Sequence, residues 1–239
     1  MIKENYYVRC ISMNQKIIYD LTTEAKSIDS ELSSLYKIDL EIRKFYRGTS
    51  LWYSPILERP DVMFLGINPG AGFYKNNNNQ LCHFYEPLKV MEYVDESQSY
   101  QLKWEWNYVF GEKGLNRLDV LEKSVKTNFC YLATENETAL KKLFTQIRGK
   151  LDIAPYEVFG NWTRQVVQQI NPKMLICEGK DALEFLKDWS FKIEYKEIEN
   201  SSDLRKGHIG DITVLQVSRT YSTLKNADGI IREIGKIIR

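Results

Sequence analysis

The chain has 239 residues, of which 43% are hydrophobic and 27% are charged. This composition excludes global disorder and supports a substantial core, either in one domain of the upper size range or in two small ones. Thirty-three Lys and Arg residues balance 32 Asp and Glu residues, and the net charge of +1 excludes a strong overall attraction to nucleic acid, so any phosphate contact requires a local patch.

The first part of the chain predicts helices followed by a buried strand. Apolar residues recur every three or four positions from Ile18 to Leu35, which predicts an amphipathic helix, and a shorter helix is expected over residues 40–45. The continuous apolar run from Asp61 to Ile67 predicts a strand that is covered on both faces, as in a parallel sheet. Asn68-Pro69-Gly70-Ala71-Gly72 then predicts a turn, because this sequence cannot continue a strand.

The middle of the chain gives a weaker pattern up to residue 123. Within it, the segment from Tyr100 to Gly114 is expected to be mostly helical, and Val125 to Ala133 predicts a second buried strand. Thr134-Glu-Asn-Glu137 matches a capping box, which predicts that a helix begins there. This helix buries an apolar stripe formed by Leu140, Leu143, Phe144 and Ile147.

The last part of the chain alternates strands and helices. The predicted helices cover residues 159–170, a segment that follows Gly179, and the chain end at 230–238; the predicted strands cover residues 173–177, 191–198 and 213–217. Strands separated by helices of this length predict an α/β fold, a three-layer α/β/α sandwich with a mostly parallel central sheet. We expect a single domain over residues 1–239, with residues 1–57 as an N-terminal helical extension packed on it.

Cysteine and histidine usage bears on metals and on the cellular compartment. Cys10, Cys82, Cys130 and Cys177 show no CxxC or Cys/His spacing, and the two histidines, His83 and His208, are far apart, so neither a zinc site nor an iron–sulfur cluster is signalled. We expect His208 to lie in a solvated loop. No stretch approaches the roughly 18 apolar residues that span a bilayer, and the N-terminus has no apolar signal core. We expect a reduced, soluble, cytoplasmic protein that needs no metal and no organic cofactor.

The turn after the first buried strand is the first place to look for a site, because ligands bind beyond the carboxyl ends of parallel strands. Gly66-Ile67-Asn68-Pro69-Gly70 lacks the spacing of a P-loop and of GxGxxG. Taken alone, it is better explained as a plain turn, since Asn and Gly tolerate left-handed backbone and Pro fixes φ.

Three segments together resemble the uracil-DNA glycosylase superfamily. Asp61-Val-Met-Phe-Leu-Gly-Ile-Asn-Pro-Gly70 is similar to the first motif of its mismatch-specific and single-strand-selective branches, in which a strand ends in G-[I/M]-N-P-G. Thr127-Asn128-Phe129 is similar to the strand that carries the family's base-reading Asn, and residues 171–183 resemble a later strand that ends in Gly before a helix. The resemblance covers roughly residues 58–239 and implies the fold of that superfamily.

The resemblance implies roles for individual residues. Asn68 matches the Asn that orients the attacking water, and Asn128 matches the residue that reads the uracil edge, whose adjacent acceptor and donor suit a carboxamide. A strand-end Asn that only forms a turn remains the alternative for Asn128. The base is expected to lie against Gly66, Ile67, Pro69 and Gly70 and to be covered by an aromatic ring, for which Phe84 is a candidate together with Phe73 and Tyr85.

The sequence departs from the family after the last strand, where H-P-S or N-P-S is usual. The corresponding stretch is Gln216-Val-Ser-Arg-Thr-Tyr-Ser222, so Ser218 or Arg219 is expected to stabilise the leaving base, although Arg219 also fits a phosphate grip or a plain surface position. Leu224 falls where the family inserts an apolar wedge into DNA, and a buried loop Leu is the alternative. The other residues expected to contact nucleic acid are Arg205, Lys206, Tyr221 and Lys225.

The sequence therefore supports three hypotheses. The first is a DNA-repair enzyme that flips a uracil-like base out of single- or double-stranded DNA and hydrolyses its N-glycosidic bond, acting as a monomer. The second is a catalytically inactive module on the same fold that binds nucleic acid or a modified base, which the missing H-P-S motif favours. The third is a role in protein interaction without nucleic acid, which the near-zero net charge favours.

Overall fold

The computed structural model describes residues 13–70, 80–198, 201–220 and 223–238. Within these residues a six-stranded sheet has the order β4-β2-β5-β8-β7-β6. Its strands are β2 (Val62–Gly66), β4 (Val125–Asn128), β5 (Met174–Glu178), β6 (Tyr195–Ile198), β7 (Ser201–Ile209) and β8 (Ile212–Val217). The strands β4, β2, β5 and β8 are parallel to one another, and β7 is antiparallel to both β8 and β6.

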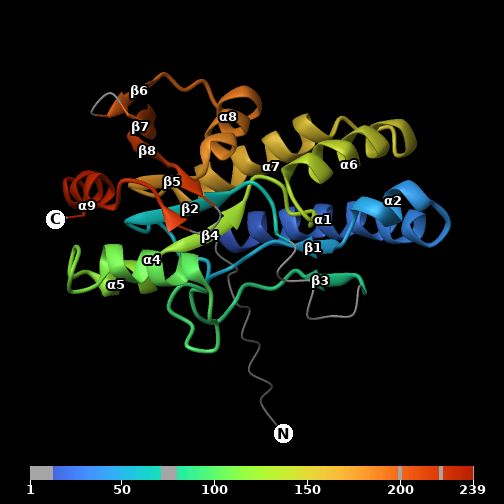
Figure 1. The fold of residues 1–239 in the computed structure, drawn as a ribbon. Coiled ribbons are helices and arrows are strands. Elements are labelled where there is room, and N and C mark those ends of the chain that lie inside the picture. Colours follow the sequence, from blue (N-terminus) through green and yellow to red (C-terminus); the bar gives the residue numbers. More distant parts are fainter. Residues whose placement is uncertain (1–12, 71–79, 199–200, 221–222, 239) are drawn as a thin grey trace, which may run out of the picture.

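Helices cover both faces of the sheet (Figure 1). One face packs against α1 (Met13–Ile38), α2 (Leu40–Phe45), α6 (Glu137–Lys150), α7 (Pro155–Ile170) and α8 (Lys180–Trp189). The other face packs against α4 (Gln101–Phe110), α5 (Leu118–Glu122) and α9 (Ala227–Gly235). Along β2, Met63 and Leu65 point to the first face and Val62 and Phe64 to the second, so the strand is fully buried, as its continuous apolar run predicts. The structure confirms the predicted α/β fold, in which helices flank a mostly parallel central sheet.

The strand β7 was missed by the sequence prediction, and it is the longest in the sheet. It carries Arg205, Lys206 and His208, and this polar sequence lacks the apolar run that identified the other strands. Pairing with β8 on one side and β6 on the other supplies its backbone partners. The expectation that His208 lies in a loop is therefore wrong, because His208 pairs with Thr213 across the ladder.

Two helix boundaries show how local chemistry sets the chain path. The helix α6 begins after Asn136, whose side chain accepts a hydrogen bond from the Ala139 N–H, so the predicted capping box at Thr134 is wrong. The helix α7 starts at Pro155 and its last residue is Ile170; the next residue, Asn171, has a left-handed backbone with φ of 50°, a conformation that Asn tolerates at the end of a helix.

The segment before β2 packs on the sheet rather than standing apart. The helix α1 contacts α7, and it contributes Leu21, Ala25 and Leu32 to the core. A short strand β1 (Gly48–Ser50) pairs with β3 (Cys82–Phe84), and residues 51–54 run along the outer edge of β4. None of the helices among the described residues is long and apolar enough to cross a membrane.

A buried carboxylate anchors α1 to the rest of the fold. Asp29 is 2% exposed, and it accepts hydrogen bonds from the Thr49 hydroxyl at 2.7 Å and from the Tyr85 hydroxyl. Nδ1 of His83 also lies 2.7 Å from the same carboxylate. Because these partners come from β1, β3 and the residue after β3, Asp29 connects the N-terminal helix to the segments beside the carboxyl end of β4.

Candidate functional site

The order of the parallel strands creates a switch point between β2 and β5. The chain leaves β2 in one direction to form β4, and then returns past β2 to form β5 and β8. Open parallel sheets bind ligands beyond the carboxyl ends of the strands at such a point, because the connecting loops there diverge. The residues at these strand ends are therefore the first candidates for a site.

Three residues lie side by side at these ends: Asn128 on β4, Gly66 on β2 and Glu178 on β5. We call them the strand-end row. Gly66 pairs with Asn128, and the register that pairs Leu65 with Cys177 places Glu178 beside Gly66. A β-carbon built on Gly66 would lie 2.2 Å from Asn128 Oδ1 and 4.0 Å from Glu178 Oε2. Both polar side chains therefore turn toward the space above Gly66, and any larger residue there would displace the Asn128 amide.

The predicted turn after β2 is held against the turn after β4. The Asn68 side-chain nitrogen donates to the Pro69 carbonyl at 3.0 Å, the Thr134 hydroxyl at 3.0 Å and the Leu132 carbonyl at 3.4 Å. Backbone hydrogen bonds from Phe129, Cys130 and Thr134 to Gly66, Ile67 and Pro69 join the same two segments. All of these side-chain bonds use the nitrogen of Asn68, so its carboxamide oxygen is the atom left to accept from a ligand or water.

Asn128 is 6% exposed and lies between Gly66 and a buried tyrosine. The Tyr53 hydroxyl lies next to Asn128 and Ser50, yet it makes no hydrogen bond of standard geometry. Burial raises the pKa of Tyr53, so this hydroxyl remains protonated and keeps both a donor and an acceptor.

Phe84, the aromatic residue expected to cover the base, lies on β3. Its backbone pairs with Ser50, its backbone oxygen accepts a hydrogen bond from the Leu51 N–H, and its side chain is 45% exposed.

A buried charged cluster adjoins the strand-end row, and the sequence analysis missed it. Lys126 lies two residues before Asn128 on the same face of β4, with a side chain 9% exposed, and it forms ion pairs with Glu92 and with Glu178 Oε2, the latter at 3.2 Å. Glu178 Oε1 accepts from the Trp106 indole at 2.8 Å and from the Tyr93 hydroxyl. The sequence did offer a signal for this cluster, because Lys126 and Glu178 lie next to apolar residues of predicted strands. Burying either charge without a partner is costly, so such residues indicate a buried ion pair.

Glu178 stays ionised in this environment. Burial alone would raise its pKa, but the charges of Lys126 and Arg219 and the hydrogen bonds from Tyr93 and Trp106 lower the pKa below the ordinary glutamate value. The carboxylate is thus a fixed negative charge beside Gly66 and is unsuited to donate a proton near neutral pH.

The residues expected after the last strand lie on a small hairpin, β9 (Arg219–Thr220) paired with β10 (Thr223–Leu224). Ser218 precedes it, and its hydroxyl lies 3.0 Å from the Gln216 side-chain nitrogen, which donates to it. Arg219 is exposed, and its charge reaches Glu178, so the structure brings Arg219 toward the strand-end row. Leu224 is 5% exposed within the core, in agreement with the alternative of a buried loop leucine. Tyr221 and Phe73 lie outside the described residues.

The remaining basic residues do not form one rim. Arg205 and Lys206 are consecutive on β7 and point to opposite faces. Arg205 is 8% exposed and lies 3.5 Å from Glu184 and 3.6 Å from Glu197, and Lys206 pairs with Glu233 at 3.1 Å. Lys225 is exposed beyond β10. The structure thus separates Arg205 and Lys206 from each other and from the strand-end row.

The site has no metal-binding geometry within the described ranges, where no group of three or more His, Cys, Asp or Glu residues could hold an ion. The chain matches no family model and none of the curated proteins with which it was compared. The function must therefore be inferred from the geometry of the site.

Proposed function

We propose that the protein binds a nucleobase extruded from DNA at the strand-end row and hydrolyses its N-glycosidic bond. The observation that carries this proposal is that two carboxamides, Asn68 and Asn128, lie at the ends of adjacent strands around Gly66. We further propose that the fold is that of the uracil-DNA glycosylase superfamily, because the segments that resemble its motifs fall at neighbouring strand ends in this structure.

Asn128 supplies the base-reading group in this proposal. Its Oδ1 faces the space above Gly66, where it would accept a hydrogen bond from a ring N–H such as N3–H of uracil. Its nitrogen would donate to the neighbouring carbonyl oxygen of the same base. Cytosine presents the opposite pattern at these positions, so the amide would favour uracil. Phe84, whose ring is exposed and whose backbone pairs with Ser50, would be the aromatic residue that covers the base.

Asn68 supplies the water-positioning group. Its nitrogen is held by Pro69 and Thr134, which fixes the plane of the amide and leaves the oxygen to accept from water. Cleavage of an N-glycosidic bond through an oxocarbenium-like state needs little nucleophilic push, so a group that orients water without deprotonating it is sufficient. Arg219 would offset the negative charge that develops on the departing base.

A second candidate is base binding without turnover, and Glu178 is the observation that favours it. An ionised carboxylate beside Gly66 would repel an anionic leaving base. This charge opposes turnover but does not oppose the binding of a neutral base.

The test is release of free base from single- and double-stranded oligonucleotides that carry one uracil. We expect release by the parent protein, a loss of at least about 100-fold in Asn68→Ala because the water is no longer positioned, and parent-like release in Asn161→Ala, an exposed asparagine of α7. Release that persists in Asn68→Ala would refute its role. No release by the parent, combined with tight binding to uracil-containing strands, would establish the binding module instead.

A further inference from the structure

An open groove of about 790 Å³ lies between the β6–β7 hairpin and α9, away from the strand-end row. We call it the hairpin groove; the residues that line it include Lys196, Ile198, Lys206, His208, Glu233 and Lys236. The strand β7 is separated from β2 by β5 and β8, and from β5 by β8 alone, so at the usual strand spacing it lies about 14 Å from β2 and about 10 Å from β5. The groove is therefore a separate feature of the molecule.

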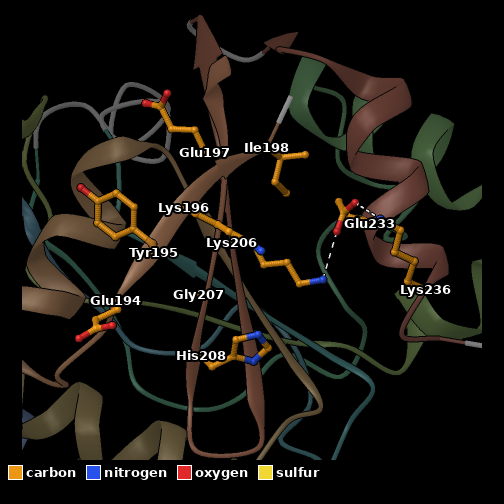
Figure 2. Close-up of a pocket in the computed structure, with 10 residues that line it drawn as sticks. All are labelled: Glu194, Tyr195, Lys196, Glu197, Ile198, Lys206, Gly207, His208, Glu233 and Lys236. Atoms are coloured by element: carbon orange, nitrogen blue, oxygen red, sulfur yellow. Dashed lines mark hydrogen bonds and ion pairs between the residues drawn. The ribbon is translucent and has the colours of Figure 1, made fainter. Parts of the chain in front are cut away.

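The wall of the hairpin groove that faces α9 is basic. Lys196 and Lys206 are directly opposite each other on β6 and β7, and both extend toward α9, which contributes Glu233 to the groove (Figure 2). Lys236 follows at the end of that helix. Glu194 and Glu197 also border the groove, but their side chains point away from this wall. Three lysines against the single carboxylate of Glu233 give the wall a net charge of +2 when His208 is neutral.

Glu233 holds two of the lysines without saturating them. It is 4% exposed, and its carboxylate pairs with Lys206 at 3.1 Å and with Lys236. Burial would raise the pKa of Glu233, but the two lysines lower it, so the carboxylate remains ionised. Because an ammonium group has three donors and Glu233 engages one from each lysine, the remaining N–H groups are available to a ligand.

The other two polar side chains of the wall have no polar partner among the described residues. Neither Lys196 nor His208 has a side-chain hydrogen bond or ion pair with any other part of the chain that the structure describes. Like charges directly opposite each other on neighbouring strands are destabilising, so the Lys196–Lys206 pair costs stability unless an anion lies between them. Features that oppose stability in this way are typical of binding sites.

We infer that the hairpin groove binds a phosphate group, held by Lys196, Lys206 and Lys236 with His208 as a further donor. Phosphate presents several oxygens in different directions, which suits cations that converge from two strands and a helix, and a single carboxylate would satisfy fewer of them. Ile198 offers an apolar surface beside this wall for the remainder of a nucleotide. The phosphate comes either from a free nucleotide or from a nucleic-acid strand. The inference does not depend on base release at the strand-end row.

The two histidines make the test selective. His208 lies in the hairpin groove and His83 lies beside Asp29, so a histidine-labelled protein gives one reporter and one internal control in NMR spectra. We would titrate the full chain at low salt with inorganic pyrophosphate, a thymidine mononucleotide and a short oligothymidylate. We expect the His208 signals to shift with saturation while the His83 signals stay unchanged. A ligand that binds only as the oligothymidylate would assign the groove to a strand, and binding of the small ligands would assign it to a nucleotide.

Substitutions identify the residues that hold the ligand. Lys196→Ala should weaken binding about tenfold, because the ligand loses one charge-assisted hydrogen bond, while Lys196 has no ion pair with any residue that the structure describes. Lys192→Ala removes an exposed lysine just before β6 that does not line the groove, and it should bind as the parent does. Absence of a His208 shift with all three ligands would overturn the inference. Equal affinity of the Lys196→Ala variant and the parent would overturn it as well.

Discussion

Replacing Lys126 by Met should destabilise the fold far more than an ordinary surface substitution. The Lys126 ammonium group lies between the carboxylates of Glu92 and Glu178, whose side chains are 16% and 2% exposed. Methionine has a similar length and fills the same space, so the change removes charge with little change in packing. Two buried carboxylates are then left facing each other without their common cation.

The expected loss is about 3–5 kcal/mol in the free energy of unfolding near neutral pH, as found when one partner of a buried ion pair is removed. The loss should depend on pH. In the parent, Glu178 has a lowered pKa, so its stabilising contribution is present above the ordinary glutamate pKa and is lost as the pH falls through the lowered value. In Lys126→Met, burial dominates and the pKa of Glu178 rises, so folding favours the protonated form and the variant loses stability as the pH increases.

The assay is urea unfolding followed by tryptophan fluorescence at about pH 7.5 and about pH 4.5. Lys141→Met is the matched control, because the Lys141 side chain is 52% exposed and pairs with Glu137 one turn away on α6; the substitution should cost no more than about 0.5 kcal/mol. The difference in the free energy of unfolding between the parent and Lys126→Met should be several-fold smaller at about pH 4.5 than at about pH 7.5. A difference below about 1 kcal/mol at pH 7.5, or the same difference at both pH values, would refute the assignment of Lys126 as the counter-ion of Glu178.

Three further substitutions test neighbouring features. Gly66→Ala places a β-carbon 2.2 Å from Asn128 Oδ1 and should cost about 1–3 kcal/mol in urea unfolding; unchanged stability would show that the amide has room to move. Asp29→Asn weakens the anchor of α1 and should increase amide hydrogen exchange in that helix well beyond the rest of the protein, whereas uniform exchange would contradict a local anchor. Tyr53→Phe should reduce the preference for uracil over cytosine in oligonucleotide binding by several-fold. Tyr100→Phe should leave this preference unchanged, because the Tyr100 hydroxyl faces Glu92; equal effects of the two substitutions would contradict a link between Tyr53 and the Asn128 amide.

The sheet could be predicted where local sequence and burial agree. The strands β2 and β5 are apolar on both faces, so a continuous apolar run identified each of them, and β8 was identified from Val214, Leu215 and Val217. The strand β7 escaped because its polar residues are satisfied by partners distant in sequence, such as Glu184 for Arg205 and Glu233 for Lys206. The sequence suggested that Arg205 and Lys206 form one nucleic-acid rim, but these ion pairs hold the two side chains on opposite faces of the sheet.

The candidate site was predictable only in part. Asn68 could be placed just beyond a strand end, because it follows an apolar run, whereas Asn128 follows Lys126 and Thr127 and was singled out only by the family resemblance. The cluster around Glu178 could not be predicted, since it depends on Trp106 and Tyr93, which lie 72 and 85 residues away along the chain. Sequence periodicity does not report such contacts. The capping box at Thr134 failed for a related reason, because its hydroxyl accepts from Asn68 across the fold.

A single binding measurement decides whether Asn128 reads a base above Gly66. Fluorescence anisotropy would compare oligonucleotides that carry a single 2′-fluoro-2′-deoxyuridine, in which the fluorine opposes cleavage, with the matching cytidine analogue. We expect the parent and Asn161→Ala to prefer the uracil strand by about tenfold, as for one well-formed pair of hydrogen bonds, and Asn128→Ala to lose this preference. Equal affinity of the parent for both strands, or a preference that survives in Asn128→Ala, would contradict this role of Asn128.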